Sequence, residues 1–169
     1  MAPARPVNLP NARRLGWAIA IAIVLLDQLS KGWVLEAFQI GERLNVLPVF
    51  DLVRVHNYGA AFSFLASGDG SQRWFLLVVA LVASVLIHRW MAGANRLTLI
   101  ALALILGGAI GNAIDRALLG SVTDFLLFYY QRWYFPAFNL ADCAITLGAV
   151  GMILDSILEW RRERITHRT

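Results

Sequence analysis

The stretch of residues 97–114 constrains the fold most, because its eighteen residues include no charged side chain. A helix that crosses a hydrocarbon core of about 30 Å needs about 20 mainly apolar residues. The spacing Gly107-x-x-x-Gly111 inside this stretch offers a small-residue face on which a second helix can pack closely. The stretch therefore predicts a membrane-spanning helix that lies within a bundle.

Three further segments, residues 15–36, 74–91 and 138–158, are long and apolar enough to be spans, so we predict four spans in total. The composition agrees, since 59% of the 169 residues are hydrophobic and only 15% are charged. The first segment starts like a signal peptide but lacks a small-x-small cleavage site, so we interpret it as an uncleaved span. Without a linker or an internal repeat, residues 1–169 are expected to form one membrane-embedded domain.

The basic residues predict the orientation of the spans. Nine arginines lie in the N-terminal arm, in the connection around residues 88–96 and in the C-terminal tail, whereas the other two connections hold five. The positive-inside rule therefore predicts that both termini face the cytoplasm. The net charge of +4 follows from this distribution and indicates no nucleic-acid partner.

The first outer connection has the pattern of a small extracytoplasmic β-sheet. Valine, leucine and phenylalanine are frequent over residues 46–55, and the turn-forming sequence Asn57-Tyr58-Gly59 follows. Several aromatic residues fall near the predicted outer boundary, as in the aromatic belts of membrane proteins. They are Trp33, Trp74, Trp133, Tyr129, Tyr130 and Tyr134.

Aspartates from different segments are expected to reach one level near the outer boundary. A rise of 1.5 Å per residue places Asp27 roughly 20 Å along the first helix and Asp115 roughly 27 Å along the third, and Asp142 follows the start of the fourth. Asp124, in the connection of residues 115–137, can reach the same level. An ionisable group at membrane depth costs about 2.5 kcal/mol or more, so each is a functional candidate.

Less specific interpretations exist for several of these groups. Asp27 and Lys31 have the i, i+4 spacing of a simple ion pair on a helix surface. Asp115 could be structural, and a lone cysteine such as Cys143 is usually a packing residue. Asp155, close to Glu159 and the arginines of the tail, is expected to be a solvated helix end.

The residue types at this level favour carboxylate chemistry. The sequence contains no GxSxG motif, and its three histidines are scattered without the spacing of a metal site, so no metal is expected. Two carboxyl groups about 3 Å apart share one proton and can hydrolyse a peptide bond by general acid and base catalysis. Spacing alone leaves open which two of the four aspartates would form such a pair.

Five sequence blocks resemble the signature motifs of bacterial lipoprotein signal peptidase, also called signal peptidase II. They occur in order between residues 23 and 150: DQLSK at 27–31, NYGAAFS at 57–63, GGAIGNAIDR at 107–116, VTDF at 122–125 and FNLAD at 138–142. The resemblance implies a mainly α-helical membrane aspartic endopeptidase, with four spans, a small extracytoplasmic β-cradle and a short outer helix.

The resemblance also implies the substrate and the site. Its catalytic pair maps to Asp124 and Asp142, without a cofactor, and its substrates are prolipoproteins cleaved on the N-terminal side of a diacylglyceryl-modified cysteine. The implied location is the bacterial cytoplasmic (inner) membrane, with the site near the outer surface among membrane lipids and open to globomycin-type inhibitors. The implied support residues are Asp27, Lys31, Asn57, Gly59, Asn112, Asp115, Arg116 and Asn139.

Two other functions fit buried aspartates in a membrane protein. A component of a proton-coupled membrane transporter would carry ionisable groups at the same depth. A structural or assembly subunit would hold the polar cluster without catalysis.

Overall fold

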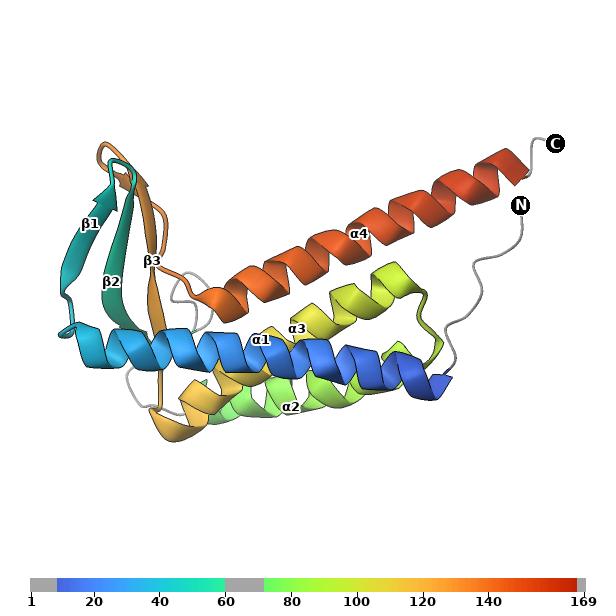
Figure 1. Ribbon diagram of the computed structural model, residues 1–169, viewed down its shortest axis with the longest axis horizontal. Helices are drawn as coiled ribbons and strands as arrows, with labels where there is room; N and C mark the ends of the chain where they lie inside the picture. Colours follow the sequence, from blue (N-terminus) through green and yellow to red (C-terminus); the bar gives the residue numbers. More distant parts are fainter. Residues whose placement is uncertain (1–8, 60–71, 167–169) are drawn as a thin grey trace.

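The computed structural model describes residues 9–59 and 72–166 and is dominated by four long helices (Figure 1). The start of the first helix and the end of the last lie at one end of the bundle, and a small sheet covers the other (Figure 1). A short 3₁₀ turn, η2, links the second and third helices. The helices are α1 (Leu9–Ala37), α2 (Gln72–Trp90), α3 (Arg96–Leu118) and α4 (Leu140–Thr166), and η2 covers Met91–Gly93.

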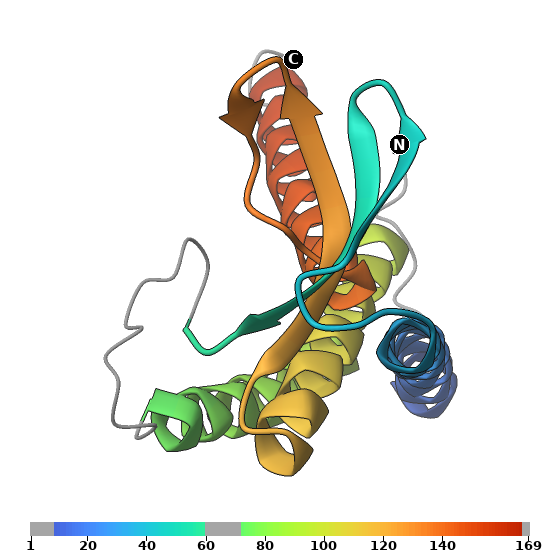
Figure 2. The same cartoon turned by 90° about the vertical axis from the view of Figure 1, so that its left-hand side faces the viewer.

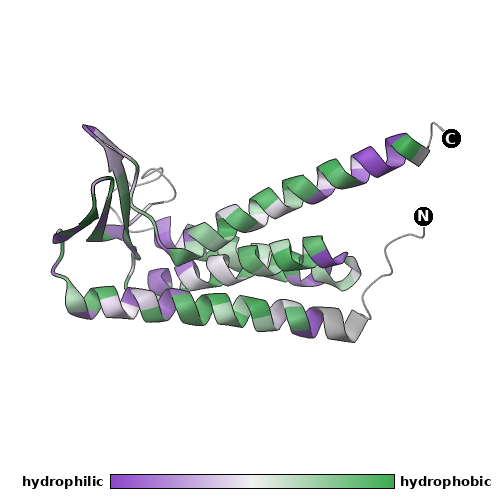
Figure 3. Ribbon diagram, turned by 45° about the horizontal axis from the view of Figure 1, so that its top comes forward, coloured by the Kyte–Doolittle hydropathy of each residue, from purple (hydrophilic) through white to green (hydrophobic). Residues whose placement is uncertain are grey.

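The four helices confirm the predicted membrane fold. The candidate spans are Arg13–Ala37, Gln72–Gly93, Arg96–Leu118 and Leu140–Ile165, the second of which continues from α2 through η2, and hydrophobic residues predominate along the helices (Figure 3). These spans extend beyond most of the predicted limits because the helices continue through polar residues at their ends. The fourth starts two residues later than predicted, since Phe138 still pairs with a strand.

Helix α3 is the centre of the bundle and contacts the other three helices. Its glycines allow two of these contacts, because a Cβ at Gly107 would lie 2.8 Å from the carbonyl oxygen of Ala20 on α1. A Cβ at Gly108 would lie 2.4 Å from the carbonyl oxygen of Ala141 on α4. The predicted small-residue face is therefore a real packing surface, and it brings α1 and α4 together around α3.

Four antiparallel strands form the sheet in the order β1-β2-β3-β4, and they lie across the ends of the helices (Figure 2). Strand β3 follows α3 after a turn in which Gly120 has a φ of 77°, a conformation that favours glycine. The described residues do not form the short outer helix that the family resemblance implies. Residues 60–71, between β2 and α2, lie outside the described ranges. The strands are β1 (Arg43–Leu47), β2 (Phe50–Asn57), β3 (Val122–Tyr130) and β4 (Trp133–Tyr134).

The sheet is attached directly to the end of α1. Arg54 on β2 donates hydrogen bonds from Nη1 to the carbonyl oxygens of Leu35, at 3.0 Å, and Phe38, at 2.8 Å. These carbonyls belong to the C-terminal end of a helix, where a cation also interacts favourably with the helix dipole. Strand β2 is therefore held at the end of the first span.

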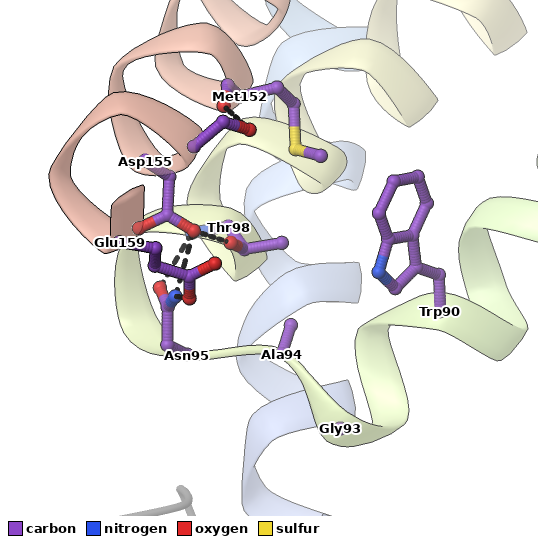
Figure 4. A pocket seen from close by; sticks show the side chains of 9 residues that line it. Trp90, Gly93, Ala94, Asn95, Thr98, Met152, Asp155 and Glu159 are labelled. Atoms are coloured by element: carbon purple, nitrogen blue, oxygen red, sulfur yellow. Dashed lines mark hydrogen bonds between the residues drawn. The ribbon is translucent and has the colours of Figure 1, made fainter. Parts of the chain in front are cut away.

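Asp155 lies at the opposite end of the bundle from the sheet. The prediction that it is a solvated helix end is wrong, because its side chain is buried, with 8% exposure. Its carboxylate accepts hydrogen bonds from Asn95 Nδ2, at 2.8 Å, and from the Thr98 hydroxyl, beside a pocket that Trp90 and Glu159 also line (Figure 4). Asn95 caps α3 by accepting from Thr98 N. Asp155 thus sits at a helix N-terminus, where backbone N–H groups and the dipole favour an anion.

Candidate active site

The predicted site residues meet where the sheet joins the helices. Asp27 and Lys31 come from α1, Asp115 comes from α3, Asp124 from β3 and Asp142 from the first turn of α4. Most of their side chains are buried, although each carries polar or charged atoms. A buried polar group is costly unless it is hydrogen-bonded, so the contacts of each group define the site.

Lys31 is the central cation of this cluster and is 2% exposed. Its Nζ lies 2.8 Å from Asp27 Oδ2 and 3.2 Å from Asp115 Oδ2, and it donates to Asn112 Oδ1 at 2.9 Å. All three N–H donors of the ammonium group therefore have an acceptor. The alternative of a surface ion pair between Asp27 and Lys31 is wrong, because bundle packing encloses both side chains.

Besides pairing with Lys31, Asp27 and Asp115 accept hydrogen bonds from backbone N–H groups. Asp27 Oδ1 accepts from the backbone N–H of Ala141 at 2.9 Å, and Asp115 Oδ2 accepts from that of Thr123 at 2.9 Å. These two contacts fix the starts of α4 and β3 relative to α1 and α3. A Cβ at Gly111 would lie 2.6 Å from Asp27 Oδ2, so the glycine makes room for this carboxylate.

Gln28 is a member of the cluster that sequence reasoning missed. Its Nε2 donates to Asp115 Oδ1 at 2.9 Å, to the Gly111 carbonyl at 3.2 Å and to Asp27 Oδ2 at 3.2 Å. The only available signal was its place beside Asp27 in the first sequence block. It joins the two supporting aspartates across the α1–α3 contact.

Asn112 connects the cation to Asp142. Its Oδ1 accepts from Lys31, so its Nδ2 points the other way and donates to Asp142 Oδ1 at 2.8 Å. Lys31 therefore selects the orientation of the Asn112 amide. With the opposite orientation, the amide oxygen would face the carboxylate.

Asn139 joins the two aspartates of the implied catalytic pair. It forms a capping box at the start of α4: Asn139 Oδ1 accepts from Asp142 N at 3.0 Å, and Asp142 Oδ2 accepts from Asn139 N at 3.3 Å. The remaining amide nitrogen, Nδ2, donates to Asp124 Oδ1 at 2.6 Å. One asparagine thus holds a carboxylate on a helix and a carboxylate on a strand.

The surroundings of Asp124 favour the protonated form of its carboxyl group. It is 2% exposed, and burial, followed by the charge of Asp142, raises the pKa of Asp124 to about 7. Hydrogen bonds from Asn57 Nδ2, at 3.0 Å, and from Asn139 oppose this shift in pKa because they favour the ionised form. Asp142 has other surroundings: it lies in the first turn of α4 and accepts hydrogen bonds from Asn112 Nδ2 and Asn139 N.

Arg116 and Gly59 complete the site on the side of β2. Arg116 Nη2 donates to the Gly59 carbonyl at 3.0 Å, and Gly59 N donates to Asn57 Oδ1 at 3.1 Å. This chain of contacts orients the Asn57 amide toward Asp124. The Nε of Arg116 is buried and has no hydrogen-bond partner among the described residues, while residues 60–63 of the second sequence block lie outside them.

The arrangement provides two carboxyl groups in unlike surroundings, which is the requirement for acid and base catalysis. His56 is not part of it, since its Nδ1 contacts Ser121 Oγ at 3.0 Å. Cys143 follows Asp142 as a free, partly buried thiol. Within the described parts of the chain, no group of three or more histidine, cysteine, aspartate or glutamate residues is arranged to hold a metal ion.

One family model and two solved structures match this chain over most of its length. The family model described as signal peptidase (SPase) II matches residues 19–158. A bacterial membrane enzyme solved at 2.3 Å superposes with a TM-score of 0.78 and 26% identity, and the match covers 94% of both chains. A second bacterial membrane enzyme, solved at 1.9 Å, has a TM-score of 0.71 and 29% identity over 91% of this chain and 97% of the other.

Similar curated proteins carry the name lipoprotein signal peptidase. The protein of Neisseria meningitidis serogroup C is 50% identical over 145 residues, which are 84% of this chain and 88% of that protein. The Neisseria gonorrhoeae protein is 48% identical, covering 89% of this chain and 93% of its own, and the Shewanella baltica protein is 45% identical over 86% of both. The transporter alternative is left without support. The chain belongs to the signal peptidase II family, membrane aspartic peptidases that remove signal peptides from prolipoproteins.

Proposed function

We propose that this peptidase acts on prolipoproteins that carry diacylglycerol on a cysteine, and that Asp124 and Asp142 cleave the bond on the N-terminal side of that cysteine. The observation that carries the assignment is the Asn139 bridge. Its backbone and side chain bind both carboxylates, so one residue fixes the pair. In the other two candidates, Asp27 and Asp115, the carboxylate oxygens already bind Lys31 and backbone N–H groups.

The unlike surroundings of the pair supply the two roles of the reaction. Asp142, ionised, takes a proton from a water molecule as the water oxygen attacks the scissile carbonyl carbon. Asp124, protonated, donates its proton to the carbonyl oxygen, and a tetrahedral diol forms. Collapse of the diol breaks the C–N bond; Asp142 delivers its proton to the leaving nitrogen, and the diol returns one to Asp124.

The support residues act on the pair through amide groups. Lys31 orients Asn112 toward Asp142, and Arg116 orients Asn57 toward Asp124 through Gly59. Each carboxylate is therefore held by an amide whose own direction is determined by a cation. Such fixed donors preorganise the charges of the site before the substrate arrives.

The location of the site suits a substrate that is anchored in the bilayer by its acyl chains. The dyad lies at the sheet end of the spans, and the arginine-rich connection and tail lie at the other end (Figure 1). The positive-inside rule supports an extracytoplasmic position for the sheet and the site, with both termini in the cytoplasm, and the proposed location is the bacterial inner membrane. Membrane lipid surrounds the site, and globomycin-type inhibitors are expected to compete for it.

A cleavage assay in detergent tests the proposed function. The purified protein should release the signal peptide from a diacylglyceryl-modified lipobox peptide without any ion gradient, and globomycin should inhibit the release. The matched peptide with an unmodified cysteine should be cleaved far more slowly. Equal cleavage of both peptides would contradict the proposed substrate class, and no cleavage of either would contradict the proposed activity.

The pKa of Asp124, about 7, predicts the alkaline limb of the pH profile. The mechanism needs Asp124 protonated, so kcat/KM should fall as the pH rises through about 7. Asn57→Ala removes a donor that favours the ionised form, which raises the pKa of Asp124 and moves this limb to higher pH. Measuring kcat/KM between about pH 5 and 9 checks the shift.

Asn45→Ala is the matched control for this prediction. Asn45 is also an asparagine of the sheet, but its side chain contacts Leu47, Asp51 and Tyr129 rather than the dyad. Its alkaline limb should coincide with that of the unaltered protein. An alkaline limb that moves to lower pH in Asn57→Ala would contradict the assigned role of Asp124.

A further inference from the structure

The sheet beyond the active site has two different faces. On one of them, the Arg43 guanidinium lies 4.8 Å from the Tyr129 ring centre and 5.1 Å from that of Tyr134, and it pairs with the Asp51 carboxylate. Asn45 Nδ2 donates to Asp51 Oδ1 and to the Tyr129 hydroxyl, both at 2.8 Å. We call these five residues the polar sheet face. The polar groups of this face interact with one another.

The other face is apolar in its outer part, beyond Asp124. Cross-strand register places Leu44 opposite Leu52, Phe50 opposite Phe128 and Tyr130 opposite Trp133, so each pair projects to the same side. The rings of Phe50 and Phe128 are 4.9 Å apart, which agrees with this register. The apolar sheet face is defined by Leu44, Phe50, Leu52, Leu126, Phe128, Tyr130 and Trp133.

Among the described residues, much of the apolar sheet face is exposed. Trp133 is 82% exposed, Tyr130 67%, Leu44 52% and Phe128 46%. A contiguous exposed patch of this kind marks an interaction site, because leaving it in water costs about 25 cal/mol per Å² of apolar area. Tryptophan and tyrosine at its outer edge combine an apolar ring with a polar atom, which suits the boundary between lipid and water.

The inner part of the same face lies at the ends of the membrane spans. Leu52 and Leu126 pack against Val34 and Phe38 of α1, and Leu140 of α4 packs against the same cluster. The face therefore begins where two lipid-exposed helices end and continues outward along strands that run across the bundle (Figures 1 and 2). Its continuity with the spans identifies the bilayer as the partner.

We propose that the apolar sheet face rests on the surface of the bilayer leaflet at the sheet end, with Tyr130 and Trp133 at the level of the lipid headgroups. The polar sheet face then points to water. This contact holds β3 at a constant height above the membrane. Because Asp124 lies two residues from Leu126 on that strand, the same contact sets the depth of the dyad.

Spin labels on adjacent positions test this surface. Cys143→Ala provides a cysteine-free background, in which single cysteines replace Phe128, Tyr130, Arg132 or Leu81 and carry a nitroxide. The proteins are reconstituted in vesicles of phosphatidylcholine and phosphatidylglycerol. Collision rates with oxygen, which concentrates in lipid, and with a water-soluble nickel chelate are then measured.

The labels at Phe128→Cys and Tyr130→Cys should collide several-fold more with oxygen than with the chelate. Leu81→Cys, exposed on α2, gives the lipid reference, and Arg132→Cys in the β3–β4 turn gives the water reference. Labels at 128 and 130 that resemble the label at 132 would overturn the proposal. Labels shielded from both reagents would overturn it as well, since they indicate a protein partner such as a second copy or a bound peptide.

A second measurement needs no label and avoids disturbing the Phe50–Phe128 contact. Brominated phospholipids quench tryptophan fluorescence only at short range, so the unaltered protein is compared with Trp133→Phe. The difference between the two proteins reports Trp133, and it should be quenched most by bromine placed near the headgroups. A Trp133 signal that brominated lipid leaves unchanged contradicts contact with the bilayer.

Discussion

Asp124→Asn and Asp142→Asn should each lower kcat for cleavage of a lipidated precursor by about 10³-fold or more, while the protein stays folded in detergent. Each replacement keeps the size of the side chain but removes the group that moves a proton. Asp124→Asn cannot donate an acidic proton to the carbonyl oxygen, and Asp142→Asn cannot accept one from water. The measurement is kcat for each purified variant, alongside its thermal unfolding temperature.

Asp155→Asn is the matched control, because Asp155 is a buried aspartate of α4 at the opposite end of the bundle. It accepts hydrogen bonds from Asn95 and Thr98, which an asparagine oxygen can also accept. Its kcat should stay close to that of the unaltered protein. Substantial cleavage by either dyad variant would show that the assignment of Asp124 and Asp142 is wrong.

Lys31→Met should have the largest effect on stability. Asp27 and Asp115 would remain buried without their cation, and removing one partner of a buried ion pair typically costs about 3–5 kcal/mol. The Asn112 amide would also lose the donor that orients it, so cleavage should fall together with the unfolding temperature. Both quantities are measured on protein purified in one detergent.

Two companion variants separate charge from packing in this experiment. Arg89→Met changes an exposed cation of α2 and should leave both quantities almost unchanged. In Lys31→Met/Asp115→Asn, one stranded charge is removed, so the double variant should be more stable than Lys31→Met alone. If the double variant is less stable than Lys31→Met, the cost does not arise from unpaired charge.

The spans, the sheet and the meeting of the aspartates follow from local properties of the sequence. Span length depends on the transfer of apolar side chains into lipid, and the depth of Asp27 and Asp115 depends only on the rise of a helix. The resemblance of five sequence blocks then singled out Asp124 and Asp142. Those aspects therefore needed no knowledge of tertiary contacts.

Other features depend on contacts between elements, and the sequence could not show them. Asp155 has charged neighbours in the chain, yet it is buried because α4 crosses the start of α3. Tyr129 and Tyr130 look equivalent in a predicted aromatic belt, but a one-residue step on a strand puts them on opposite faces. The two-sided role of Asn139 likewise requires the positions of both β3 and α4.

The Asn139 bridge also affects when the enzyme becomes active during its own synthesis. Asp124 and its neighbours on α1, α3 and β3 leave the ribosome first, whereas Asn139 and Asp142 arrive with the last helix. On the proposed assignment, the nascent chain therefore lacks one carboxyl group of the dyad until α4 has inserted and Ala141 N, in its first turn, has bound Asp27 on α1. The order of the elements along the chain thus makes the last helix to be synthesised the one that completes the proposed site.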